Sequence, residues 1–469
     1  LQITSLRADM VATNVANAST PGYVRRSVQV SENVLAGRTA GVRTDGIARS
    51  QNQSLTAERR NLTSDLAQAD VLSSTWRTIS SMVGDTAEGT GLFKAFGNFE
   101  SALSNLALSP ESGADASAVL SSANAIIKEF HSLSQMAVSL RTEADREIGQ
   151  GRDIVNSALK TIENLNGQLS GMDRTTGEAA ALIDERNRVL DTISEYIPVQ
   201  AVPRNYGMID VVTPEGVFLL AGTARQLEFN GSSSFGPAQT FESGALSGLS
   251  VDGISLTPGS ASYGAVSSGL FGALFTLRDQ DLPTFSAQLD TLAGDFISRL
   301  SDDTIDPTKT PGDPGLFVDS TGTGDPGLAS RIAINAAIDP AQGGATWRLR
   351  DGIGAVAQGP TGDSTILNKL LGAIKLVSPI SSNGIQGSFS STEMAAQFAS
   401  LAGQKRLQNE GILSSTSAQH TMLLAAEQSE NGVDIDSEMQ DLILIEQAYA
   451  ANARVIEIAG QMINRLMEI

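Results

Sequence analysis

Apolar residues recur at helical spacing near the start of the chain. One stripe with steps of three and four residues is formed by Ile3, Leu6, Met10 and Thr13. It stops at the segment Asn-Ala-Ser-Thr-Pro-Gly-Tyr, residues 17–23. Pro21 disfavours helical conformation at Thr20, and Pro followed by Gly22 is typical of a type II turn, in which the glycine takes positive φ. We predict that a helix ends here and that extended chain follows.

The last segment of the chain carries a longer stripe. Steps of three and four residues run through Leu442, Ile445, Tyr449, Asn452, Ile456, Ala459, Ile463 and Leu466. This is a heptad seam, which predicts a helix that packs against other helices. Asp434 and Asp436 precede it, where a helix N-terminus favours acids. Asn452 either fixes the register of the seam, as one polar seam residue can, or simply faces solvent.

The two ends carry opposite charge. Residues 1–60 hold eight arginines and four carboxylates, whereas residues 427–469 hold nine carboxylates and two arginines. Opposite charge and matching stripes indicate that the ends pair, with each other or with neighbouring molecules. The alternative is two unrelated amphipathic helices on one globule.

The interior begins as helix. A stripe runs from Val119 to Leu140 and resumes at Val155, after a break near Gly149 and Gly151. This pattern predicts one long helix with a stutter. A further helix is predicted over about 178–196, ending before Pro198.

The pattern changes after Pro198. Short β-like runs at 199–202, 208–212 and 217–220 are separated by Pro and Gly, and 230–262 is rich in Gly and Ser. Helix returns at about 270–300 and 391–426. The expected fold is therefore multidomain and mainly α, with long coiled-coil-like helices from both chain ends and an inserted β-rich outer domain. We expect a terminal coiled-coil assembly domain (1–35 plus 430–469), a helical rod-like domain (36–197 plus 265–300 plus 385–429) and a β-rich outer domain (198–264 plus 301–384).

Composition narrows the functional classes. The formal net charge of −20 over 469 residues disfavours nucleic acid and anionic membrane surfaces as partners. The chain has no cysteine and only two histidines, which excludes disulfides, thiol catalysis and Cys-ligated metals. No apolar run of about 18 residues predicts a transmembrane helix, and no cleaved signal peptide is visible.

No residue pattern makes a positive case for catalysis, a metal or a cofactor. The glycine pattern at 322, 324 and 327 matches a dinucleotide fingerprint by letters only and contains Pro326. Carboxylates in the loop 302–313 lack the ligand alternation of a calcium site, so a solvated acidic loop is expected. Glu178, Asp184 and Glu185 are expected on a solvated helix face, and His131 and His420 as structural or exposed residues.

The terminal motifs resemble the axial proteins of the bacterial flagellum. The segment NVANASTPGYVR (14–25) is similar to the N-terminal motif of rod, hook and first hook-associated proteins, and EQAYAANARVI (446–456) to their C-terminal motif. In the interior, ALIDERNRVL (181–190), GLFGALFTLRD (269–279) and GVDIDSE (432–438) resemble the hook-associated protein 1 group. The resemblance further implies helical residues upstream of Leu1 and a reduced outer region.

This resemblance implies a structural subunit that forms the junction between hook and filament as a ring on the hook tip. Implied partners are further copies, the hook protein, hook-associated protein 3 and an export chaperone bound to the C-terminal helix, with no nucleic acid or membrane. The implied location is extracellular, on the flagellum, after type III export without a cleaved signal. The assembly residues are expected to be Asn14, Asn17, Thr20, Pro21, Gly22, Tyr23, Arg25, Leu442, Gln447, Tyr449, Asn452, Val455, Ile456, Ile463 and Leu466.

Two other functions stay open on the sequence. A hook or distal-rod subunit shares the terminal motifs, so only the interior motifs argue against it. A secreted enzyme or adhesin built on flagellar-type ends belongs to a different class, and hydrolase or glycan-binding assays on residues 40–425 would discriminate it.

Overall fold

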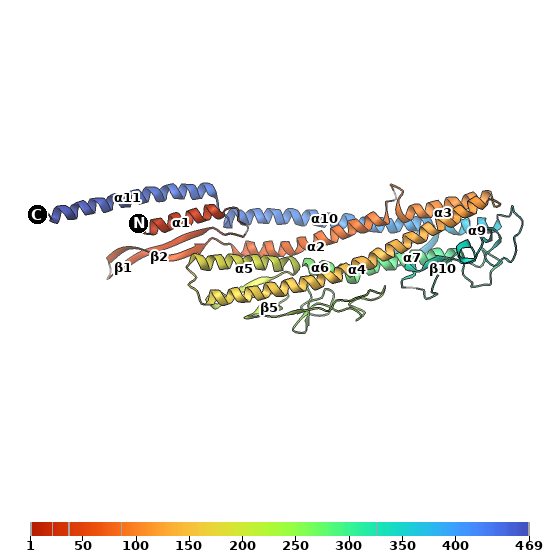
Figure 1. The fold of residues 1–469 in the computed structure, drawn as a ribbon, viewed down its shortest axis with the longest axis horizontal. Coiled ribbons are helices and arrows are strands. Elements are labelled where there is room, and N and C mark those ends of the chain that lie inside the picture. The colour runs from red at the N-terminus through yellow and green to blue at the C-terminus, as the bar shows by residue number, and fades with distance from the viewer. Residues whose placement is uncertain (1, 21, 36–37, 86, 325, 468–469) are drawn as a thin grey trace.

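The computed structural model describes residues 2–20, 22–35, 38–85, 87–324 and 326–467 as an elongated molecule (Figure 1). The helices are α1 (Gln2–Asn17), α2 (Gln53–Val83), α3 (Gly91–Leu108), α4 (Gly113–Ser170), α5 (Gly177–Tyr196), α6 (Gly269–Thr276), α7 (Leu282–Leu300), α8 (Arg348–Asp351), α9 (Thr365–Lys375), α10 (Ser391–Asn431) and α11 (Ile435–Met467). The start of α1 and the end of α11 lie at the same end of the molecule (Figure 1).

The strands form small separate sheets. They are β1 (Arg26–Leu35), β2 (Arg38–Arg49), β3 (Gln200–Pro203), β4 (Ile209–Val212), β5 (Phe218–Ala221), β6 (Thr223–Ala224), β7 (Leu227–Glu228), β8 (Ser250–Val251), β9 (Ile254–Ser255), β10 (Phe317–Asp319), β11 (Ile332–Ile334), β12 (Ser378–Ser382) and β13 (Ile385–Phe389). The described pairs are all antiparallel, in sheets of orders β1-β2, β3-β4-β5-β6, β7-β8-β9, β10-β11 and β12-β13. The prediction of a mainly α multidomain chain with long helices from both ends is confirmed, and the β structure predicted between them consists of small separate sheets.

The long helix α4 is continuous, and its buried positions contain one stutter, where two steps of four residues follow each other from Leu133 through Ala137 to Arg141. The stutter lies earlier in the helix than the predicted position near Gly149 and Gly151. Its buried positions continue at heptad spacing through Ala137, Arg141, Ala144, Ile148, Gly151 and Val155. The apolar stripe is interrupted in the sequence because two buried seam positions hold a charged residue, Arg141, and a glycine, Gly151. At Gly151 an added Cβ would lie 2.8 Å from ring atoms of Phe271 and Tyr196, so the glycine lets α5 and α6 approach α4 closely.

Two hydrophobic cores lie along this helix. The first gathers the end of α2 with α3, the first half of α4, α7 and residues between 305 and 402, whereas the second gathers the second half of α4 with α5, α6 and residues between 197 and 266. Segments 198–264 and 301–384, which the sequence grouped into one outer domain, thus pack in different cores. Segment 198–264 packs on α5, α6 and the second half of α4, whereas segment 301–384 packs on α7, α3 and the first half of α4. The domain boundaries themselves stay a prediction.

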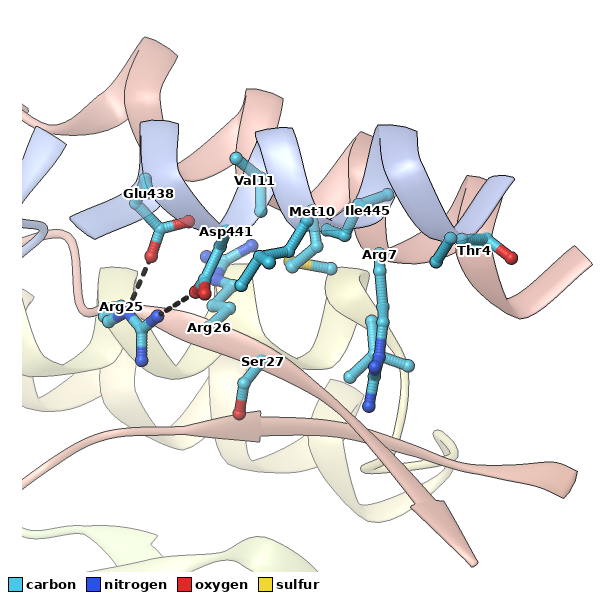
Figure 2. Close-up of a pocket in the computed structure, with 13 residues that line it drawn as sticks. Thr4, Arg7, Met10, Val11, Arg25, Arg26, Ser27, Glu438, Asp441 and Ile445 are labelled. Atoms are coloured by element: carbon cyan, nitrogen blue, oxygen red, sulfur yellow. Dashed lines mark hydrogen bonds and ion pairs between the residues drawn. The ribbon is translucent and has the colours of Figure 1, made fainter. Parts of the chain in front are cut away.

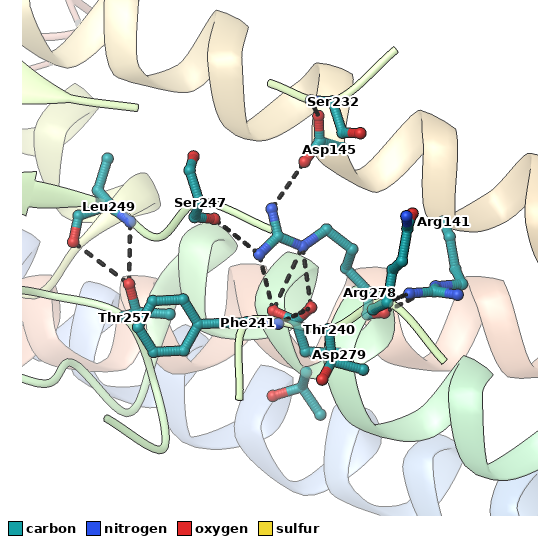
Figure 3. Close-up of polar contacts among 12 residues, drawn as sticks. Arg141, Asp145, Ser232, Thr240, Phe241, Ser247, Leu249, Thr257, Arg278 and Asp279 are labelled. Carbon is teal, nitrogen blue, oxygen red and sulfur yellow. Dashed lines mark hydrogen bonds and ion pairs between the residues drawn. The ribbon is translucent and has the colours of Figure 1, made fainter. Parts of the chain in front are cut away.

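A buried arginine cluster fills the boundary between the two cores (Figure 3). Arg278 is fully buried and binds Asp145 at 2.7 Å, Asp279 at 2.8 Å and the carbonyl oxygen of Ser247 at 2.9 Å. Arg141 donates to the carbonyl oxygens of Arg278, Gly236 and Gln239. Burial lowers the pKa of Arg141, and nearby Asp279 opposes that shift. The cluster joins α4 to the 236–247 loop and to the π-helical turn Leu277–Asp281 that precedes α7.

The N-terminal region contains a β-hairpin where the sequence grouping placed the start of the helical rod. Extended chain after the turn was predicted, but β2 then returns antiparallel to β1, with Arg26 opposite Arg49 and Val28 opposite Ile47. The sequence of β2 has no apolar stripe at helical spacing. A two-stranded ribbon of this kind is stable only when it packs against other elements. The hairpin contacts α1 and α5.

Candidate functional site where the chain ends meet

The predicted turn after α1 is closed by a hydrogen bond from the Tyr23 amide to the Thr20 carbonyl at 3.1 Å. Gly22 has φ of +75°, as a type II turn requires. A Cβ at this position would also lie 2.9 Å from Cγ of Arg188. Asn17 binds back to the carbonyl of Thr13 at 2.9 Å and fixes the end of the helix. Pro21 lies outside the described residues.

Asn14 is the centre of the site. It is 1 % exposed and uses both ends of its amide. Its Nδ2 donates to the carbonyl of Arg26 at 2.8 Å and to Glu438 Oε2 at 3.1 Å. Its Oδ1 accepts from the Tyr23 hydroxyl at 2.8 Å and the Arg26 amide at 3.1 Å. One side chain of α1 thereby holds the turn, the first residue of β1 and the first turn of α11.

Arg25, the residue before β1, connects the start of this strand to α11 (Figure 2). Its Nε lies 2.6 Å from Glu438 Oε1, and a terminal nitrogen lies 3.2 Å from Asp441 Oδ2. Glu438 is completely buried, so its ion pair and its bond from Asn14 compensate for the loss of water around the carboxylate. This contact confirms that the oppositely charged ends pair with each other within one chain.

Asp184 is buried, which corrects the expectation of a solvated carboxylate. It accepts from Arg26 at 2.6 Å and also from Arg49, so it links both strands of the hairpin to α5. Burial lowers the pKa of Arg49, and the adjacent Asp184 opposes that shift. The Arg26 guanidinium stands 4.8 Å from the centre of the Tyr23 ring. Burial raises the pKa of the Tyr23 hydroxyl, although the Arg26 charge opposes the shift.

Asn431, the last residue of α10, holds both ends of the hairpin. Its carbonyl accepts from the Arg25 amide at 2.9 Å, and its side-chain oxygen accepts from the Asn52 amide at 2.7 Å. Asn52 in turn caps α2 through the amides of Ser54 and Leu55. We call the set Asn14, Tyr23, Arg25, Arg26, Asp184, Asn431 and Glu438 the polar node. Glu438 and Asp184 lie inside motifs quoted above, but no spacing rule marked them as buried.

Beyond the node, ion pairs join α2 to both α10 and α5. Arg59 binds Glu427 at 2.5 Å and Asp191 at 2.8 Å, and Arg60 binds Asp191 at 2.7 Å. Arg186 has no carboxylate partner among the described residues and donates to Asn166 and to the carbonyl of Gly207. Burial and the nearby arginines lower the pKa of Arg186 to about 10.

The predicted seam of α11 is mostly exposed to solvent, whereas Asn14 and Glu438 of the polar node are buried. Leu442 and Ile445 are half-buried on the α1 side, whereas Tyr449, Ile456, Ile463 and Leu466 are each more than half exposed. Gln447, Asn452 and Val455 are exposed as well. The structure therefore brings Asn14, Tyr23 and Arg25 together, and it leaves the predicted residues from Gln447 onward open on one helix.

An open groove of about 420 Å³ runs between α1, β1 and α11 (Figure 2). Its walls include Arg7 and Met10 of α1 together with Leu444 and Ala448 of α11. Arg7 forms no ion pair with any residue that the structure describes, unlike Arg25 and Arg26 beside it.

The other candidates have local partners. Asp303 pairs with Lys309, and Asp306 accepts from Thr308. The glycine pattern 322–327 follows β10 and leads only into a three-residue 3₁₀ turn. His131 lies 3.0 Å from the carbonyl of Ile332, and His420 lies 3.2 Å from the Thr63 hydroxyl.

Within the residues that the structure describes, no helix is long and apolar enough to cross a bilayer, and no cluster of three or more His, Cys, Asp or Glu is suited to a metal ion.

Two family models match the chain. The model described as "Flagellar hook-associated protein FlgK helical domain" matches residues 76–307, and "Flagellar basal body rod FlgEFG protein C-terminal" matches 428–469. Flagellar hook-associated protein 1 of Bacillus subtilis is 22 % identical over 97 % of this chain and 94 % of its own length. The Salmonella typhimurium protein of that name is 24 % identical over 60 % of this chain, which spans about half (51 %) of the relative.

One solved structure is also similar. The flagellar hook junction protein FlgK from Burkholderia pseudomallei aligns with a TM-score of 0.44 and 22 % identity, over 56 % of this chain and 46 % of the other.

Proposed function

The chain belongs to the flagellar hook-associated protein 1 family and is a structural component of the flagellum, and from this premise we propose that it forms the junction between hook and filament. In this proposal, copies assemble as a ring on the hook tip. The observation that carries it is the open seam of α11, where Tyr449, Ile456 and Ile463 are exposed on a helix whose base is locked by the polar node.

Helix energetics support assembly through this seam. Beyond its first turns, α11 is solvent-exposed on every side. A helix with so little buried surface has little stability of its own, because most helix stability in proteins comes from tertiary packing. Packing against further copies buries the exposed seam and supplies that stability. The node meanwhile fixes where α11 begins and in which direction it points.

The proposed partners follow from the same premise. The hook protein lies below the ring, and hook-associated protein 3 adds next. An export chaperone holds the C-terminal helix before assembly, because the same exposed apolar residues would otherwise associate prematurely. The subunit reaches the cell exterior through the flagellar type III apparatus without a cleaved signal. The assembly residues remain those predicted from the sequence, Pro21 and Gln447 included.

A hook or distal-rod subunit is the second candidate. The match of residues 428–469 to a basal-body rod model fits either function. The match of residues 76–307 to the hook-associated helical domain favours the junction, since it covers the two-core region instead of the shared ends.

Deletion of the gene, followed by electron microscopy and an assay for flagellin in the medium, tests the proposal. Bare hooks with free flagellin are expected, because export continues while the filament lacks a base. Missing hooks would place the subunit in the rod or hook, and intact filaments would contradict a junction function. In the complemented strain, Tyr449→Asp is expected to abolish incorporation while the purified chain melts as the parent does.

A further inference from the structure

A second apolar seam runs along α11 beside the predicted one. Steps of four and three residues run through Leu444, Ala448, Ala451, Val455, Ile458 and Met462. The four large side chains of this set are 56–65 % exposed. We call this set seam two, and the set Leu442, Ile445, Tyr449, Asn452, Ile456, Ala459 and Ile463 seam one.

The two seams face different directions. With 3.6 residues per turn, their midlines lie roughly 100° apart around the helix axis. The charged residues between 442 and 466 are Glu446, Arg454, Glu457 and Arg465. By the same geometry Glu446, Arg454 and Glu457 lie on the third side of the helix, with Glu446 next to seam one, whereas Arg465 is the position at which seam two ends. This helix is thus apolar on two faces and charged on one, which is unlike a helix that packs with a single partner.

The chain's own first helix can cover only one of these faces. At the base of α11, Leu442 and Ile445 of seam one are half-buried beside α1, while Leu444 of seam two is exposed. Seam two instead begins as a wall of the groove, through Leu444 and Ala448, and continues past it along α11.

We propose that seam two, together with the groove, is the surface that receives the α11 helix of a second copy of this chain. This inference deepens the proposed junction function and rests on it. The contact is between unlike faces, so seam two of one copy meets seam one of the next. Heterologous contacts of this kind close into rings or continue as helical arrays, whereas two like faces would stop at a dimer.

Charge complementarity supports this occupant. Arg7 stands at the groove without an ion pair within the described residues. Glu446, in the position that flanks seam one, also forms no ion pair with described residues. Residues flanking a heptad seam commonly pair between helices and set partner and orientation. A neighbouring α11 that enters along seam two brings such a carboxylate towards the free arginine.

Cysteine cross-linking tests the contact directly, because the chain contains no cysteine of its own. A strain is made to co-express two full-length copies, one with Ile458→Cys or Ala451→Cys on seam two and the other with Ala459→Cys or Ile456→Cys on seam one. Oxidation of isolated flagella is expected to give a disulfide-linked dimer only when both copies are present, since a disulfide requires Cβ atoms about 4 Å apart. Gln461→Cys, on the charged side, replaces the seam-two cysteine in the control and is expected to give no dimer.

Other results would overturn the inference. Dimers from a single cysteine variant expressed alone would show that like faces pair, and no dimer in any seam-one and seam-two combination would show that the faces do not meet.

Substitutions separate this inference from the junction function. Val455→Asp is expected to lower incorporation at least tenfold, whereas the matched Ala450→Asp on the charged side is expected to incorporate normally. If Tyr449→Asp blocks incorporation and Val455→Asp does not, seam two is not the receiving surface although the junction function stands. If neither blocks incorporation, the proposed assembly through α11 fails as a whole.

Discussion

The middle of the molecule and its terminal end are held together by different forces. In the first core, Phe96, Phe296 and Phe317 are fully buried, and their ring centres approach to 4.7 Å. At the terminal end, the buried groups are Asn14 and Glu438, joined by hydrogen bonds and ion pairs. Large apolar residues of α11 remain exposed there.

This difference separates folding from assembly. Burial of aromatic and aliphatic surface stabilises the middle without any partner. At the terminal end, the buried hydrogen bonds and ion pairs mainly fix the direction of α11. Hydrogen bonds have strict geometry, and each contributes a modest net free energy of about 1 kcal/mol to stability. Its apolar surface is left for contacts outside the chain. The two regions should therefore respond to substitution in different assays.

The largest effect is expected from Phe296→Ala. The side chain contacts three other rings in the first core, and its removal leaves a cavity that the surrounding helices cannot fill. We expect a loss of about 3–5 kcal/mol in the free energy of unfolding, measured by urea denaturation. Tyr449→Ala is the matched aromatic control at the open end, and it should leave the unfolding curve unchanged. Equal losses for both would contradict the division between the regions.

A smaller and local effect is expected from Asn14→Ala. The change leaves the Arg26 amide, the Tyr23 hydroxyl and Glu438 without one partner each, at a cost of about 1–3 kcal/mol for a buried unsatisfied group. Amide hydrogen exchange in α1 and in the first turns of α11 should rise about 10- to 100-fold. Exchange in α3 and α7 should not change. Asn452→Ala, at an exposed asparagine, is the control, and protection of α1 like that of the parent chain would show that the node is not what holds the ends.

The smallest effect is expected at His420, between the two regions. Burial and the neighbouring Arg59 lower the pKa of this histidine, and Glu427 opposes the shift. The unfolded chain therefore binds the proton more readily, so stability falls as the pH drops through the ordinary histidine value of about 6.5. Melting temperatures measured at pH 7.5 and pH 5.5 should show this loss. His420→Gln should reduce the difference between the two pH values, and an unaltered difference would assign the pH dependence to other groups.

The sequence predicted the elements better than their contacts. Strong periodicity marked α4, α5, α10 and α11, and Pro with Gly marked the turn after α1. The sequence predicted one long helix for α4 but placed its stutter near Gly149 and Gly151, because hydrophobic patterning cannot recognise a buried arginine or a packing glycine, such as Arg141 and Gly151. Arg141 is tolerated in the seam because backbone carbonyls from a loop about a hundred residues away receive it.

The same limitation applies to the candidate site. Asn14, Tyr23 and Arg25 were marked by a motif, and the opposite charges of the ends indicated that they pair. The burial of Asp184 depends on two arginines that a hairpin brings together, and no local pattern carries that information. Exposure of the α11 seam likewise follows from the position of α1, not from the heptad itself.

The unbroken course of α4 has a mechanical consequence. Its 58 residues span about 87 Å and take part in both cores, so no loop linker lies between the cores on this path. A twist applied to one core passes to the other through the helical backbone of α4. The arginine cluster stabilises the section of α4 that lies between the two cores. The two cores must therefore turn as one shaft.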